Sequence, residues 1–316
     1  DGAINQLDKD LERHIKEYLS IRCGMQEIFS YPWMEESYVN AILQSTDGIL
    51  ALSTPPSPSE RFIRSSLLPN LCKAVAKNER YYGDFAIFET AQVFHDTDYT
   101  TPYDPREKLP SQRKNVAGAF VSAGKDVAAL FRKAKGVVEM MPRYTHMERY
   151  DFRQVEKPVW ADEVVWLNIY LGEERIGDLA LLSKRVSMAC GIKNVNVMLF
   201  QLDQDALVPL RSRTNTFTHL AEYPMTDYDI SLLLDGEVKW ADVAETIEGV
   251  KNPLLHGASF VDEYRGKQVP AGKKSLTARL TIGSTEKTLT SAEIEEVANS
   301  VLKKLSKRFG AELRSR

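Results

Sequence analysis

Apolar side chains recur at helical spacing near the start of the chain and alternate with polar ones in many later stretches. Leu7, Leu11 and Ile15 share one face of an amphipathic helix predicted over residues 7–22, and Gly24 is a suitable stop. The other elements predicted before residue 210 are strands over 27–31, 85–94, 115–122, 164–171, 175–182 and 195–202, helices over 64–82 and 127–141, and a polar loop over 96–114. This order predicts an α+β domain, residues 1–210, built on a largely antiparallel sheet.

A second domain is predicted over residues 223–316, after a polar and weakly patterned linker at 211–222. Its predicted elements are a strand over 230–234, a helix over 240–250, strands over 257–264 and 275–282, a helix over 291–309 and a short edge strand at 312–313. The β-α-β-β-α-β order is that of a ferredoxin-like fold. The last helix begins with a capping box, in which Thr290 bonds the amide of Glu293 and the Glu293 carboxylate reaches back.

Strand alternation gives the second sheet an apolar face toward the helices and an open polar face. Ile230, Leu232 and Leu234 share the apolar side of the first strand. The polar residues predicted to gather on the open face are Ser231, Asp262, Tyr264, Ser275 and Arg279, with Lys273 and Lys274 at its rim. These residues form the candidate site of the chain.

The residue types of this candidate site suit a single-stranded RNA base. Asp262 can accept from the N1–H and N2–H edge of guanine, with Ser275 reading the same base and Ser231 leaving room for it. Tyr264 offers a ring for stacking, and the basic side chains can bind phosphates. The alternative interpretation is a polar sheet face without a ligand, because antiparallel sheets commonly expose one face to water.

Composition and charge narrow these possibilities. The 316 residues exceed the usual size of one domain, and no apolar run is long enough to span a membrane. Three scattered cysteines, Cys23, Cys72 and Cys190, indicate a reducing compartment, so we expect a cytoplasmic protein without a disulfide framework or a metal site. The net charge is −3, and residues 223–316 hold 14 basic and 14 acidic side chains. Any RNA contact must therefore be a local patch helped by another surface.

Six short motifs in the second domain occur in an order that is specific even though each motif alone is weak. They are Tyr223-Pro224, Asp229 to Asp235 (DISLLLD), Asp262 to Gly266 (DEYRG), Gly272 to Leu276 (GKKSL), Thr288-Leu289-Thr290 and Gly310 to Arg314 (GAELR). In this order they resemble the ferredoxin-fold anticodon-binding domain of phenylalanyl-tRNA synthetases. The resemblance covers essentially all of residues 223–316 and implies that the open face binds the anticodon of phenylalanine tRNA.

The first domain resembles the β subunit of the same enzymes more loosely. The stretches that carry the resemblance are residues 22–31 (RCGMQEIFSY), 64–69 (RSSLLP), 88–94 (FETAQVF) and 135–139 (KGVVE). They resemble the catalytically silent copy of the class II synthetase fold in that subunit. The resemblance implies a non-catalytic C-terminal portion that scaffolds the catalytic α subunit. It further implies a heterotetramer of two α and two β subunits in which α binds ATP, Mg²⁺ and phenylalanine.

The sequence also departs from the family's pattern. Tyr228 stands where an arginine usually precedes the first strand, which puts one phosphate contact in doubt, and Val261 replaces an aromatic residue. Thr90-Ala91 stands where a glycine is common. The modules that precede this portion in the family, including the editing domain, are not expected in this chain, and neither is hydrolytic proofreading.

Two functions of other classes stay open. A single-chain synthetase with its own adenylation site would need a Gly-x-Gly-x-x-Arg segment, which the sequence lacks, and we expect Arg64 and Glu89 to serve folding or subunit contacts. Amino-acid-dependent pyrophosphate exchange by this chain alone would favour it. A non-synthetase interaction protein with a ferredoxin-like regulatory domain would instead bind a small effector, which a thermal-shift screen with amino acids would detect.

Overall fold

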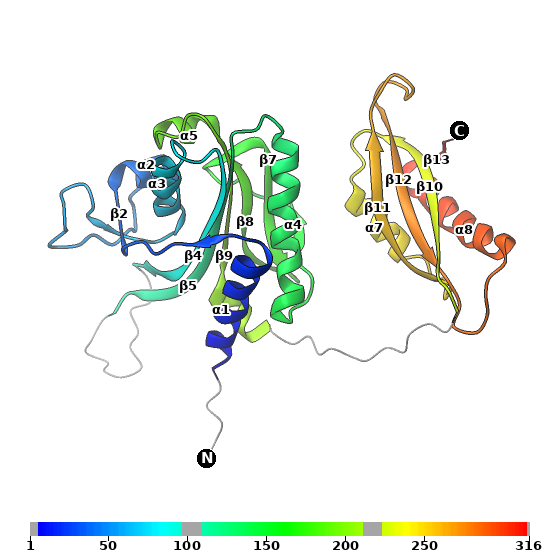
Figure 1. Cartoon of the computed structure of the whole chain (residues 1–316), viewed down its shortest axis with the longest axis horizontal. Coiled ribbons are helices and arrows are strands. Elements are labelled where there is room, and N and C mark those ends of the chain that lie inside the picture. The colour runs from blue at the N-terminus through cyan, green and yellow to red at the C-terminus, as the bar shows by residue number, and fades with distance from the viewer. Residues whose placement is uncertain (1–5, 97–108, 211–222, 315–316) are drawn as a thin grey trace, which may run out of the picture. The chain divides into compact units, whose positions relative to one another are not determined.

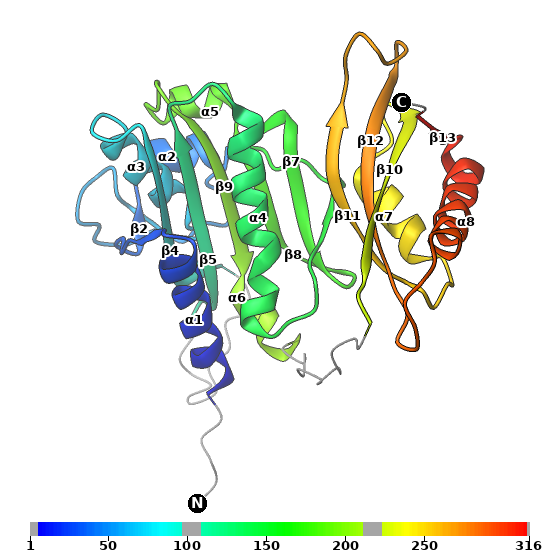
Figure 2. The same ribbon diagram turned by 45° about the vertical axis from the view of Figure 1, so that its right-hand side comes forward.

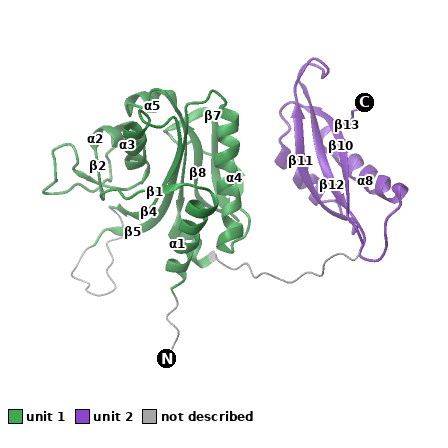
Figure 3. Cartoon of the chain, viewed as in Figure 1, with its two compact units in different colours: residues 1–215 green, residues 216–316 purple. Residues whose placement is uncertain are grey.

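The computed structural model describes residues 6–96, 109–210 and 223–314. The chain divides into two compact units, residues 1–215 and 216–316 (Figure 3). The predicted linker, residues 211–222, lies outside the described residues.

Unit 1 is built on a seven-stranded sheet with the strand order β1-β4-β5-β9-β8-β7-β6. Its strands are β1 (Gln26–Glu27), β4 (Asp84–His95), β5 (Ser111–Ser122), β6 (Asp151–Arg153), β7 (Ala161–Leu171), β8 (Glu174–Leu182) and β9 (Asn196–Asp203). Every pairing in this sheet is antiparallel except that of β1 with β4. The predicted antiparallel α+β domain is therefore confirmed.

Helices cover both faces of this sheet (Figures 1 and 2). One face carries α1 (Leu7–Glu17), which continues as a π-helical turn over Tyr18–Arg22, and α4 (Val127–Thr145). The other face carries α2 (Glu36–Ile42), α3 (Leu68–Asn78) and α5 (Lys184–Ala189). The remaining elements are the short strands β2 (Trp33–Met34) and β3 (Phe62–Ile63), α6 (Gln204–Leu207) and a 3-10 turn over Val208–Leu210.

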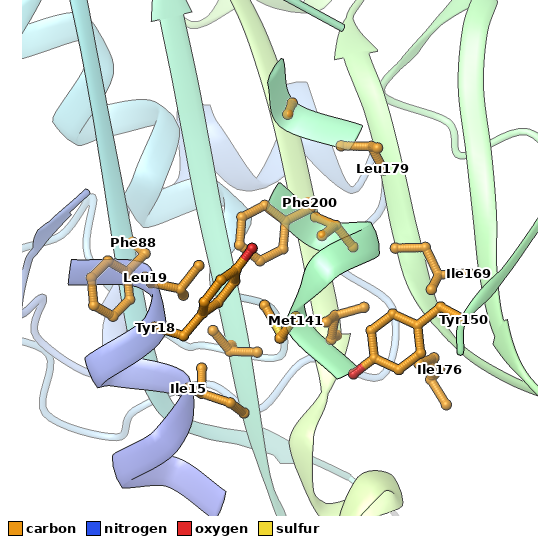
Figure 4. Packing of buried hydrophobic residues seen from close by; sticks show 14 of the residues in the cluster. Ile15, Tyr18, Leu19, Phe88, Met141, Tyr150, Ile169, Ile176, Leu179 and Phe200 are labelled. Carbon is orange, nitrogen blue, oxygen red and sulfur yellow. The ribbon is translucent and has the colours of Figure 1, made fainter. Parts of the chain in front are cut away.

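The core beneath α1 and α4 shows how the strand pattern fills the interior (Figure 4). Phe88, Phe120 and Phe200 lie on neighbouring strands, are almost fully buried and belong to the cluster that also holds Tyr18 and Met141. Aromatic side chains of this size contribute much of the apolar area that a core removes from water.

Three predicted boundaries in unit 1 differ from the structure. The helix predicted from residue 64 begins at Leu68, because residues 64–67 form a buried turn tied by side-chain hydrogen bonds. The strand predicted over 27–31 is only Gln26–Glu27. The loop predicted over 96–114 was wrong at its end, because β5 begins at Ser111 and pairs with β4; residues 97–108 lie outside the described residues.

Unit 2 has the predicted β-α-β-β-α-β order. Its elements are β10 (Thr226–Asp235), α7 (Trp240–Glu248), β11 (Leu255–Tyr264), β12 (Lys273–Ile282), α8 (Ser291–Phe309) and β13 (Glu312–Leu313). The four strands form an antiparallel sheet in the order β11-β12-β10-β13, and α7 and α8 share its apolar core. None of the helices in the described parts of the chain is long and apolar enough to cross a membrane.

Candidate nucleic-acid interface

The two faces of the unit 2 sheet have the composition that strand alternation predicts. Ile230, Leu232 and Leu234 of β10 are at most 3% exposed and pack under the helices, as do the alternate residues of β12. The opposite face of β10 carries Asp229 and Ser231, which lie across from Arg279 and Thr277 of β12. On β11, Asp262 lies across from Thr277 and Tyr264 across from Ser275. The predicted grouping of Ser231, Asp262, Tyr264, Ser275 and Arg279 on one face is therefore present.

A polar row crosses the middle of this open face. Asp262, Thr277 and Ser231 sit side by side on β11, β12 and β10, and the Ser231 and Thr277 hydroxyls are 3.1 Å apart. Asp262 is exposed, and within the described residues its carboxylate has no hydrogen bond or ion pair. The row therefore offers one carboxylate with unused acceptor capacity beside two hydroxyls. Thr277 was not among the predicted site residues, although its strand parity places it there.

The next row holds Tyr264, Ser275 and Leu233. Tyr264 is 41% exposed, and the Arg314 guanidinium lies 5.6 Å from its ring centroid. Ser275 is only 3% exposed, so a direct contact with a base requires its neighbours to move. Gly266 leaves room for the Tyr264 hydroxyl, which would lie 2.2 Å from a Cβ at that position.

Two of the predicted basic contacts on this face are paired with the sheet's own carboxylates. Arg279 donates from Nε and Nη2 to the two Asp229 oxygens, at 2.7 and 2.8 Å. This hydrogen bonding lowers the pKa of Asp229 and raises the pKa of Arg279. Lys273 Nζ lies 3.0 Å from Asp235 Oδ1. A phosphate at either cation would therefore compete with a carboxylate already in place.

The predicted position of Lys274 was wrong. Its side chain is 4% exposed rather than at an open rim, and its Nζ lies 2.8 Å from Glu263 Oε2. Lys274 has the parity of Leu276, which belongs to the helix-side core. Burial together with a single carboxylate partner makes Lys274 part of the fold rather than a phosphate contact.

Arg314 supplies the cation that the sequence prediction missed. Its guanidinium lies over the Tyr264 ring and donates to Gln268 Oε1, a neutral acceptor, so its charge is not neutralised by a carboxylate in those contacts. Its backbone amide donates to Ser231 O, which fixes the residue at the edge of the face. The signal for Arg314 was the final motif, whose arginine follows the edge strand. The face can thus present an acceptor for a base, a ring for stacking and a cation for a phosphate.

Comparisons with known proteins identify a family for each part of the chain. Residues 221–314 match the family described as the ferredoxin-fold anticodon binding domain. Residues 2–204 match the family described as the phenylalanyl tRNA synthetase beta chain CLM domain, which covers more than half of the chain. The chain belongs to the phenylalanyl-tRNA synthetase beta-chain family.

Individual relatives match most of the length of this chain. The phenylalanine–tRNA ligase beta subunit of Carboxydothermus hydrogenoformans is 28% identical over 319 residues and covers 97% of this chain. That of Oceanobacillus iheyensis is 27% identical and covers 96%. This chain spans 38% of the length of each of these two relatives.

Solved structures show the fold alone. Two structures of pyrrolysyl-tRNA synthetase from Desulfitobacterium hafniense superpose with TM-scores of 0.51 and 0.52 at 12% identity. They cover 64% and 65% of this chain, and this chain covers 68% and 69% of them. The matched part of the chain therefore shares the class II synthetase fold.

The pair Arg64 and Glu89, which could have suggested a nucleotide site, is buried. Arg64 is 8% exposed and Glu89 is 2% exposed, and Arg64 Nη1 donates to Glu89 Oε1 at 3.1 Å. Ser30 donates to the same carboxylate from its amide and its hydroxyl, and Arg64 Nε donates to Gln92 O. Burial lowers the pKa of Arg64, and the Glu89 carboxylate opposes that shift. Both side chains are therefore engaged in hydrogen bonds that join Arg64 and Ser30 to β4.

The parts of the chain that the structure describes hold no group of three His, Cys, Asp or Glu side chains placed to bind a metal ion.

Proposed function

We propose that unit 2 binds the anticodon of phenylalanine tRNA on its open face and that unit 1 scaffolds a catalytic α subunit. The observation that supports the first role is the row of Asp262, Thr277 and Ser231, with the exposed Asp262 carboxylate free of protein partners among the described residues. Guanine presents two adjacent donors, N1–H and N2–H, to such a carboxylate. The first anticodon base is the one we assign to Asp262.

In this proposal the remaining residues of the face have separate tasks. Ser231 leaves space for the flat base, and Tyr264 offers its ring for stacking. Arg314 contacts a phosphate, while Arg279 and Lys273 contribute only if they exchange their carboxylate partners for the RNA. Ser275 contacts the base only after its neighbours have moved, because Ser275 is buried.

The scaffold role is supported by the family membership of unit 1 and by polar side chains that are already hydrogen-bonded within it. Arg64, the arginine of the stretch RSSLLP, donates to Glu89 and Gln92 and is unavailable to a phosphate in this arrangement. We therefore assign ATP, Mg²⁺ and phenylalanine to the α partner, in a cytoplasmic assembly of two α and two β subunits. Residues 1–210 would be the silent core, 211–222 the linker and 223–316 the anticodon-binding domain.

Co-purification with an α subunit from the same source tests the scaffold role. We expect a stable complex by size exclusion with light scattering, and amino-acid-dependent pyrophosphate exchange only in samples that contain α. Exchange by this chain alone would show an adenylation site of its own and contradict the proposal. A folded chain that does not bind α would contradict the scaffold role of this portion while leaving the RNA-binding role to be tested separately.

A further inference from the structure

Two adjacent tyrosine rings are exposed to solvent just after the end of α3 in unit 1. Tyr81 is 66% exposed and Tyr82 is 60% exposed, and their ring centroids lie 6.5 Å apart. The amides of both residues donate to Asn78 O, so the backbone that carries the rings is held in a hydrogen-bonded turn. Aromatic rings contribute most to stability when they are buried, so two exposed rings on a fixed turn indicate a surface that binds a partner.

Two further loops meet the turn of the tyrosines at the same end of the sheet. The Glu79 carboxylate accepts hydrogen bonds from the Lys193 amide, which lies between α5 and β9. Gly83 O accepts from the Ala123 amide, in the turn that follows β5. These hydrogen bonds bring together residues 79–83, 123–125 and 193–194.

Each of these three loops carries an exposed cation. Arg80, Lys125 and Lys193 form no ion pair among the residues that the structure describes. The Arg80 guanidinium lies 4.6 Å from the Tyr81 ring centroid. The neighbouring carboxylates accept hydrogen bonds from backbone amides and a hydroxyl instead, so the cations are available to an anionic ligand. We call Arg80, Tyr81, Tyr82, Lys125 and Lys193 the tyrosine patch.

The composition of the tyrosine patch favours a single strand of nucleic acid over a protein partner. Proteins that bind single strands without reading their sequence combine aromatic rings, on which bases stack, with cations that follow the phosphates. The buried centre of a protein–protein interface is instead depleted of charged residues, and lysine in particular is rare there. Lysines make up two of the five residues of the tyrosine patch, so the patch has the chemistry of the first kind of surface.

We propose that the tyrosine patch is a second RNA-binding surface, which takes a short unpaired segment of RNA with bases stacked on Tyr81 and Tyr82 and phosphates at the three cations. RNA is the nucleic acid to which we assign it, because the chain belongs to a family of tRNA synthetase chains. The patch lies in unit 1 and does not depend on the role proposed for the open face of unit 2. It would supply the additional surface that an RNA contact needs when residues 223–316 carry no excess of positive charge.

The test is the affinity of the full chain for a fluorescently labelled octauridylate at low ionic strength, measured by anisotropy. A background chain that carries Tyr264→Ala and Arg314→Ala lacks the stacking ring and the cation of the open face, and we expect it to keep the binding. In that background, Tyr81→Ala together with Tyr82→Ala should weaken binding at least about tenfold, because both stacking rings are lost. Loss of binding in the background chain, or an unchanged affinity in the tyrosine variant, would overturn the inference.

Three comparisons locate the ligand and identify its chemistry. Tyr31→Ala is the matched control, because Tyr31 is another exposed tyrosine of unit 1, and an equal loss of affinity in this variant would contradict binding at the tyrosine patch. Lys125→Ala together with Lys193→Ala should make the fall of log affinity with log salt concentration shallower by about 1.4, because each phosphate contact on a single strand contributes about 0.7. An unchanged slope would contradict phosphates at these lysines. Tighter binding of octadeoxyuridylate than of octauridylate would overturn the assignment to RNA.

Discussion

At the scale of single residues, some charged side chains on and around the open face of unit 2 form ion pairs within the protein and others do not. Arg279 is held by both oxygens of Asp229, and Lys274 is buried against Glu263. Asp262 and Arg314 have no opposite charge as a hydrogen-bond partner among the described residues. In the proposed complex, RNA would contact Asp262 and Arg314 without first breaking an ion pair, and this difference separates the expected effects of mutation.

Replacement of Arg314 should therefore affect RNA binding, whereas replacement of Lys274 should affect the stability of the fold. We expect Arg314→Ala to weaken RNA binding for any anticodon sequence. The fall of log affinity with log salt concentration should become shallower by about one unit of slope. Lys274→Ala should leave that slope unchanged and cost about 1–3 kcal/mol of stability, because Glu263 loses its buried partner. Filter binding at several salt concentrations and urea unfolding measure the two effects. A larger salt effect from Lys274→Ala than from Arg314→Ala would contradict the assignment.

The Arg64–Glu89 pair should behave as a structural unit. Among the described residues, Arg64→Ala leaves the buried Glu89 carboxylate with Ser30 as its remaining donor, so we expect a loss of about 3–5 kcal/mol in the unfolding free energy of unit 1. Arg61→Ala is the control, since Arg61 forms an exposed ion pair with Glu36 and its loss should cost less than about 1 kcal/mol. Urea unfolding followed by tryptophan fluorescence compares them, and equal effects would contradict a folding role for Arg64.

At the scale of secondary-structure elements, α8 has the bounds and the N-terminal cap that its own sequence predicts. Its predicted range, 291–309, and its capping box are both confirmed, with Thr290 N donating to Glu293 Oε2 at 2.8 Å. Hydrogen bonds from Lys287 and Thr290 lower the pKa of Glu293 to about 2. The box is a property of adjacent residues, so the sequence suffices to predict it.

The stability of α8 should depend on pH through Glu293. Because its folded pKa is below its unfolded value of 4.5, its contribution is present above pH 4.5 and is lost as the pH falls toward 2. We expect Glu293→Gln to reduce the pH dependence of unfolding in that window, and Thr290→Ala to cost about 1 kcal/mol at neutral pH. Glu295→Gln is the control on the same helix. An unchanged pH dependence in Glu293→Gln would contradict the hydrogen bonds of the box.

Nonlocal pairings were harder to predict from the sequence. Strand parity correctly placed Asp262 with Tyr264 and Ile230 with the core, because the period of two is local to each strand. The Asp229–Arg279 pair depends on which residues of β10 and β12 face each other, and that register is set by the whole sheet. In the same way, the start of β5 at Ser111 depends on its partner β4, since residues 111–114 are polar and give no strand signal alone.

At the scale of the whole molecule, the balance of charge limits what the chain does alone. The net charge is −3, and the second domain carries equal numbers of acidic and basic residues. Nonspecific attraction to RNA is therefore small, and specific contacts must provide most of the affinity. Joining these contacts to others in an assembly with an α subunit would raise the effective concentration of the anticodon at the open face.

The most direct measurement is the affinity of the full chain for an anticodon stem-loop of phenylalanine tRNA, compared with stem-loops in which the first anticodon base is changed. We predict a preference for guanine of about 1–3 kcal/mol, by analogy with base-edge contacts in DNA. Asp262→Ala should remove this preference. Asp227→Ala is the control, because Asp227 is a carboxylate on the same face of β10 as Asp229, and this variant should retain the preference. Equal affinity of the wild-type chain for all four bases would contradict recognition of the first anticodon base by Asp262.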